Sequence, residues 1–136
     1  MLRVASADPA PEFLAFVRAW LDMLAEAQLA EACAQLDRPN SYGLTWTAAA
    51  IRQLLTDTFG PGTRFGAQHP DGPTFTRTAS ASGSPRVKIG AFTDGSGYWM
   101  DHDVPLNGEW SDLTAQFEFI REPHGFLVVL HDLHVL

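Results

Sequence analysis

The polar side chains best suited to chemistry lie near the end of the chain, in the stretch His131-Asp132-Leu133-His134. Asp132 and His134 are two residues apart, so on a strand their side chains lie side by side on one face. A carboxylate beside an imidazole orients the ring and sets its pKa, as a general base requires. His131 alternates with apolar neighbours instead, which is more typical of a core or edge histidine with one hydrogen bond.

A second polar cluster is Asp101-His102-Asp103. On an extended chain Asp101 and Asp103 share one face and His102 opposes them. Two carboxylates on one face could bind a hard cation, or one of them could act as a base if buried. A solvated acidic loop is the simpler interpretation, and we predict neither a metal site nor a cofactor. If the strand that carries Asp101 lies near the final strand, Asp101 would join Asp132 and His134 in a catalytic site.

Aromatic residues near these clusters are the candidates for ligand binding. Tyr98 and Trp99 precede the acidic cluster, and Trp110 precedes the clearest strand of the chain. Together with His131 they could line an apolar pocket. For Trp110 a structural role as a hydrophobic lid is the more ordinary expectation. The glycine-rich run at residues 94–97 predicts a hairpin turn, because neither a helix nor a lysine follows it as in a phosphate-binding loop.

Length and composition predict one domain over residues 1–136. Hydrophobic residues make up 46% of the chain, which is enough for a core without covalent staples. The single cysteine, Cys33, cannot form an internal disulfide, and a reducing compartment follows as the simpler expectation. The opening residues lack the apolar run of a signal peptide, and no stretch approaches the length of a membrane span. We therefore expect a soluble, cytoplasmic protein.

The charge balance narrows the classes of partner. The chain has 9 Lys and Arg against 16 Asp and Glu, and its net charge is −7. Nucleic acid is not expected as a partner, because its binding depends largely on basic side chains that neutralise phosphates. An anionic membrane surface is excluded on the same ground. A basic partner remains open, although moderate acidity more often serves solubility alone.

Hydrophobic periodicity predicts helices first and strands afterwards. The helices are expected from Asp8-Pro9 to about residue 24, over residues 28–36, and from residue 48 to about 59, with Thr45 or Thr47 as the last N-cap. The strands are expected over residues 74–80, 86–92, 98–100, 113–120 and 126–135, with a loop at residues 104–110 around Pro105. Segregated helices and strands predict an α+β fold, with about three N-terminal helices packed on a curved antiparallel sheet of roughly four to five strands.

This order of elements, with an aromatic first helix whose stripe is Phe13, Phe16, Val17, Trp20, Leu21 and Leu24, resembles the NTF2-like (cone-shaped α+β) superfamily. The resemblance covers most of the chain but rests on element order rather than on a specific motif. It implies a curved sheet with a pocket at its open end, and a homodimer through the outer face of the sheet. The superfamily includes isomerases, dehydratases and plain binding domains, so the fold does not settle the function.

The second half, especially residues 105–114 and 130–136, is similar to small uncharacterised bacterial proteins, a likeness that brings no activity with it. Two classes of function remain. The first is a non-catalytic module that binds a small apolar ligand or a protein partner, and a small acidic immunity-type protein belongs to this class. The alternative is a cofactor-independent isomerase or dehydratase with Asp132 or Asp101 as base and His134 and Tyr98 as hydrogen-bond partners. An enclosed cavity around these groups would distinguish the enzyme from the binding module.

Overall fold

The protein is an α+β domain, as predicted, in a computed structural model that describes residues 1–136. Its helices are α1 (Ala10–Ala25), α2 (Leu29–Ala34), α3 (Ala48–Phe59), α4 (Arg64–Gln68) and the short 3-10 helix η1 (Thr78–Ser80). Its strands are β1 (Val87–Ala91), β2 (Gly97–Leu106), β3 (Glu109–Glu122) and β4 (Gly125–Val135). No helix has the length and apolar composition that a membrane crossing requires.

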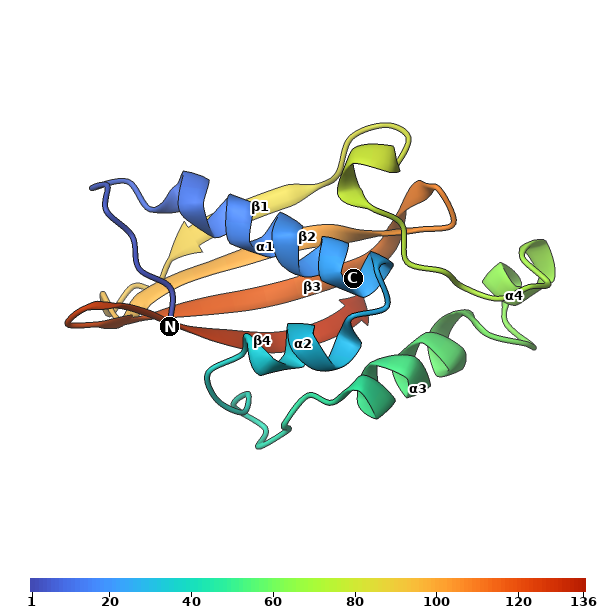
Figure 1. Ribbon diagram of the computed structural model, residues 1–136, viewed down its shortest axis with the longest axis horizontal. Coiled ribbons are helices and arrows are strands. Elements are labelled where there is room, and N and C mark those ends of the chain that lie inside the picture. Colours follow the sequence, from blue (N-terminus) through green and yellow to red (C-terminus); the bar gives the residue numbers. More distant parts are fainter.

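The four strands form one antiparallel sheet in the order β1-β2-β3-β4, so each strand pairs with the next one along the chain. Helix α1 lies across one face of this sheet, while α2 and α3 lie along the side of β4 (Figure 1). Consecutive strands can form such a meander through short hairpins. The turn between β1 and β2 is the predicted glycine-rich one, in which Asp94 accepts a hydrogen bond from the backbone N–H of Ser96 at 2.9 Å.

The core lies between the helices and the face of the sheet that they cover, which we call the inner face. The strands contribute side chains in alternation, as the period of a half-buried strand requires. The inner-face residues buried in this core are Met100, Ala115, Phe117, Phe119, Phe126, Val128, Leu130 and Leu133. Phe13 of α1 stacks on Phe119 with 4.0 Å between ring centroids, which fixes the helix against the middle of the sheet.

Local sequence signals explain where the main helices begin. Asp8 accepts a hydrogen bond from the N–H of Ala10 at 3.2 Å, at the predicted start of α1. Thr47 caps α3 by accepting from the N–H of Ala50 at 3.1 Å, which resolves the choice between Thr45 and Thr47. Helix α4 was not predicted, because five residues are too few to show a hydrophobic period.

The strand predicted at residues 74–80 is wrong, and the sheet has four strands rather than five. Phe75 makes only an isolated bridge to Leu106, and the chain then turns into η1. The backbone N–H of Thr78 donates to the carboxylate of Asp22 at 2.8 Å. This contact with the end of α1 ties the segment to a helix, and its β-branched composition is overridden by tertiary structure.

The loop predicted at residues 104–110 is also wrong, because β2 continues to Leu106 and a tight hairpin leads into β3 at Glu109. The register shifts between Asp103 and Pro105, which is the signature of a β-bulge. Proline is tolerated at a bulge since it has no N–H to leave unpaired there. The Pro105 carbonyl accepts a hydrogen bond from the N–H of Thr76 at 3.0 Å.

Candidate functional site

The candidate site is the outer face of the sheet, which is opposite the helices. Here the strand register sets polar residues side by side in rows across the sheet. One row is Lys88, Asp101, Gln116 and Asp132, and the next is Gly90, Trp99, Glu118 and Val129. Among these residues only Val129, which is 3% exposed, is buried. We use "outer face" below for these two rows together with His131 and His134.

A shallow depression of about 270 Å³ lies in the middle of the outer face and opens to solvent. Its lining residues are Trp99, Asp101, Gln116, Phe117, Glu118 and His131. A Cβ atom at Gly90 would lie 2.5 Å from the indole of Trp99, so the ring lies directly over the glycine of the neighbouring strand. The absence of a side chain at Gly90 thus gives Trp99 its place at the edge of this depression.

The predicted Asp132–His134 pair is present. Nδ1 of His134 lies 2.7 Å from Oδ2 of Asp132, and the other carboxylate oxygen accepts from the N–H of Leu133 at 2.8 Å. The two side chains retain 37% and 39% of their solvent exposure, which places the pair at the surface. Asp132 and Asp101 lie on the two strands that flank β3, with Gln116 between them, and are therefore on the order of 10 Å apart.

His131 occupies a β-bulge, where Gln116 pairs with Asp132 and Phe117 pairs with Leu130. Its carbonyl accepts a hydrogen bond from the Asn40 side chain at 2.9 Å, whereas its buried Nδ1 atom has no hydrogen-bond partner. The bulge turns the ring toward the depression on the outer face. His131 thus lies on the edge strand β4 and lines the candidate site, but its buried Nδ1 atom lacks the hydrogen bond expected from the sequence.

Two of the predicted ligand-binding residues lie elsewhere. Tyr98 is on the inner face, where its ring packs 5.4 Å from that of Phe13. Trp110 is on β3, opposite Pro105 near the other end of β2, with its ring 5.6 Å from that of His102. The structure therefore brings together Trp99, His131 and Asp101, and separates them from Tyr98 and Trp110.

Gln116 and Glu118, which were not predicted as site residues, also line the depression. Both lie on the polar side of the clearest predicted strand, where they alternate with buried phenylalanines. That alternation was the available signal. It places the residues on one face, but does not show that the face is free of covering elements.

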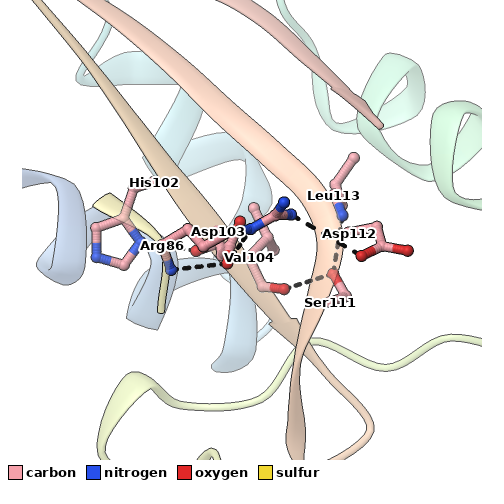
Figure 2. Close-up of polar contacts among 7 residues, drawn as sticks. All are labelled: Arg86, His102, Asp103, Val104, Ser111, Asp112 and Leu113. Atoms are coloured by element: carbon pink, nitrogen blue, oxygen red, sulfur yellow. Dashed lines mark hydrogen bonds and ion pairs between the residues drawn. The ribbon is translucent and has the colours of Figure 1, made fainter. Parts of the chain in front are cut away.

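Beside the outer face, the carboxylate of Asp103 is buried and tied to the segment before β1 (Figure 2). The Arg86 backbone N–H and Nε atom both donate to Oδ2 of Asp103, at 2.8 and 3.2 Å. The side-chain hydrogen bond to Asp103 raises the pKa of Arg86 most, and the negative charge of the Asp103 carboxylate raises it further. Because Asp103 is held in this way, it is a structural carboxylate that joins β1 to β2.

Figure 2 also shows how the β-bulge in β2 is satisfied. The Ser111 hydroxyl donates to the carbonyl of Val104 at 2.6 Å and accepts from the N–H of Leu113 at 3.1 Å. A carbonyl left without a ladder partner inside a protein costs stability, and the serine removes that cost. Ser111 thus holds the bulge of β2 against the start of β3.

His102 points to the inner face and is fully buried. Its Nδ1 atom lies 2.7 Å from the carbonyl oxygen of Asp103, so this nitrogen carries the hydrogen. Nε2 then accepts a hydrogen bond from Nε of Arg18 at 3.4 Å. Burial, and secondarily the charge of Arg18, lowers the pKa of His102. The ring is a neutral structural group rather than part of the outer face.

The lowered pKa of His102 predicts a pH-dependent stability. The unfolded chain protonates this imidazole at about pH 6.5, whereas the folded protein resists protonation. Its contribution should be fully present above that pH and decline as the pH falls below it. We expect His102→Gln to flatten this part of the stability profile, measured by urea unfolding across the acid range. An unchanged slope in the variant would contradict the assignment.

The polar groups of the outer face do not converge in one enclosed cavity. The helix–sheet interior is filled by a core of 22 buried residues. The Asp132–His134 pair faces solvent, with Asp101 two strands away. No group of three or more histidine, cysteine or acidic side chains has the geometry of a metal site.

Comparison with family models, with curated proteins and with solved structures finds no match to this chain.

Proposed function

We propose that the protein is a non-catalytic interaction module whose outer face binds a protein partner with basic side chains. The observation that carries this proposal is a sheet face without a covering helix on which an indole, two carboxylates and one imidazole surround a shallow depression (Figure 1). Aromatic side chains with a polar rim are typical of protein interfaces. Trp99 supplies the aromatic anchor, and Asp101 and Glu118 supply the rim.

The charges of the outer face support a basic partner. Its carboxylates are Asp101, Glu118 and Asp132, and Lys88 at the strand edge is its only lysine or arginine. The net charge of −7 extends the same sign over the whole molecule. Such a field accelerates association with a positively charged surface and disfavours acidic partners. A small acidic protein that neutralises a basic toxin would have this character.

A protein partner is favoured over the small apolar ligand that the sequence left open. The depression, at about 270 Å³, is open to solvent, and four of its six lining residues are polar or charged. Small-molecule sites are usually enclosed, mainly apolar and roughly 300–1,000 Å³ in volume. A broad, half-buried face with one aromatic anchor is better matched to a protein surface.

Charge reversal on the outer face tests the proposal. A displayed peptide library selected against the protein should yield peptides rich in lysine and arginine. Asp101→Lys and Glu118→Lys should each weaken binding of these peptides by about 30-fold, because a central interface residue contributes about 2 kcal/mol. Glu31→Lys is the matched control, since Glu31 is exposed on α2 away from the sheet. The measurement is a binding titration by calorimetry.

Two outcomes would contradict the proposal. If the selected peptides lack basic residues, the outer face does not select its partner by charge. Equal losses in Glu31→Lys and in the two outer-face variants would show that net charge alone governs binding, with no role for this face. Urea unfolding of each variant separates a loss of binding from a loss of fold.

A further inference from the structure

One edge of the sheet is open. Strand β1 pairs with β2 on one side and with no segment on the other. The opposite edge, along β4, is covered: Leu2 exchanges backbone hydrogen bonds with Phe126 at 2.8 Å, and the side chains of Asp37 and Trp46 bond to the backbone of Val128 and Leu130. An uncovered edge presents a row of free N–H and C=O groups to a further strand.

The pairing of β1 with β2 shows which backbone groups are free. The carbonyl of Arg86 accepts from Asp103, and the N–H of Phe92 donates to Gly97, so even-numbered residues of this strand bond toward β2. In an antiparallel ladder the alternate residues direct their N–H and C=O groups the other way. Those residues are Val87, Ile89 and Ala91. The side chains of Val87 and Ile89 are also 38% and 41% exposed.

We propose that β1 pairs antiparallel with β1 of a second copy of this chain, about a two-fold axis at Ile89. In that register Ile89 lies opposite Ile89 of the second copy, and Val87 lies opposite Ala91. Each of these opposed pairs can exchange two backbone hydrogen bonds, because the free groups of both strands face each other. The two sheets then continue into one, with the helices of both copies on the same face.

The outer-face side chains of β1 fit this register. Lysine on an edge strand ordinarily disfavours pairing, because two such charges meet. Here Lys88 lies opposite Gly90 of the second copy, so the two lysines do not face each other. The indole that covers Gly90 is that of Trp99, which places an aromatic ring beside the incoming ammonium group. Within its own chain Lys88 already has Asp101 as its cross-strand neighbour. The contact therefore sets no like charges opposite each other.

The inner face of the edge also accommodates a second copy. A groove of about 360 Å³ runs between the start of α1 and β1, lined by Ala7, Asp8, Pro9, Ala10, Ile89, Gly90, Ala91 and Tyr98. In the proposed register Val87 of the second copy lies beside Ala91, at this groove. The two-fold axis repeats the contact at the other end of the strand. Apolar side chains that are exposed in one chain thus become covered in both.

Sedimentation equilibrium across a wide concentration range tests the pairing. The wild-type protein should reach twice the mass of one chain, and Ile89→Lys should raise the dissociation constant at least about tenfold, since the charge is introduced twice at the axis. Val135→Lys is the matched control, because Val135 is a similarly exposed β-branched residue at the end of β4. Its dissociation constant should equal that of the wild type. Circular dichroism verifies that each variant is folded.

A cysteine cross-link tests the register itself. In a Cys33→Ser background, Ile89→Cys should give a disulfide-linked dimer on oxidation, because hydrogen-bonded antiparallel residues have Cα atoms about 5.5 Å apart, within disulfide reach. Val135→Cys in the same background should stay uncrosslinked. A wild-type protein that is monomeric at every concentration would overturn the proposal, and so would a dimer that Ile89→Lys leaves intact.

The test of dimerisation and the test of the proposed function use different variants, so either can fail without the other. Peptide binding by the outer face is measured with Asp101→Lys, whereas dimerisation is measured with Ile89→Lys. A dimer lost in Asp101→Lys but kept in Ile89→Lys would instead place the interface on the outer face, as the resemblance to NTF2-like proteins implies. That result would overturn the edge pairing.

Discussion

Replacing Phe117 by alanine should lower the free energy of unfolding by about 3–5 kcal/mol, the usual cost of truncating a buried aromatic side chain. Phe117 is 1% exposed at the centre of the inner face. Its ring meets that of Trp20 edge-on, with centroids 5.2 Å apart, and that of Phe16 at 6.0 Å. A domain of this size has a total stability of about 5–15 kcal/mol, so the loss is a large part of it. Urea unfolding gives the value directly.

Ile120→Ala is the matched control for this prediction. Ile120 is also on β3 and equally apolar, but it lies on the outer side and is only half-buried. We expect a cost of about 1 kcal/mol, because little packed volume is lost there. A cost as large as that of Phe117→Ala would show that the outer side is as tightly packed as the core. It would also remove the basis for proposing a binding face there.

The sequence predicted those parts of the fold in which local signals and tertiary contacts agree. The aromatic stripe of α1 and the alternation along β3 each give one apolar face, and both faces are buried in the structure. Thr47 and the turn at Asp94 follow from side-chain hydrogen bonds to nearby backbone, which act over a few residues. Such features depend on residues close together in the sequence, so they can be predicted from a short segment alone.

The errors arise where distant residues decide the local structure. Residues 101–106 appear polar and interrupted by Pro105, yet they form a strand because Asp103 is neutralised by Arg86 and the bulge at Val104 is satisfied by Ser111. Both partners come from other elements. The segment that was predicted as a strand at residues 74–80 bonds instead to the β2–β3 hairpin through Thr76 and, within η1, to Asp22 of α1 through Thr78. Neither contact can be inferred from a window of sequence.

The sequence predicted one pair of neighbouring side chains in the candidate site, but not which residues come together to form the whole site. The Asp132–His134 contact follows from spacing alone, since residues two apart on a strand share a face. The meeting of Trp99 with His131 depends on strand order and on the bulge at His131, which shifts the register by one residue. Tyr98 was grouped with Trp99 although adjacent strand residues point to opposite faces. Both lay on one predicted strand, so alternation alone could have separated them.

The register of β2 rests on Gly97, so its replacement by alanine should affect both fold and binding. A Cβ at Gly97 would lie 2.0 Å from the carbonyl oxygen of Phe119, a backbone atom that cannot move without disturbing β3. We expect a loss of about 2–4 kcal/mol in unfolding free energy from this overlap and from backbone strain.

Gly95→Ala is the control: Gly95 has a φ of +77° but open space around it, so only a strain of about 1 kcal/mol applies. Since Trp99 and Asp101 follow Gly97 by two and four residues, Gly97→Ala should also weaken peptide binding in calorimetry, whereas Gly95→Ala should not. Equal effects of the two substitutions would mean that turn strain, rather than the close approach to β3, sets the position of the outer face.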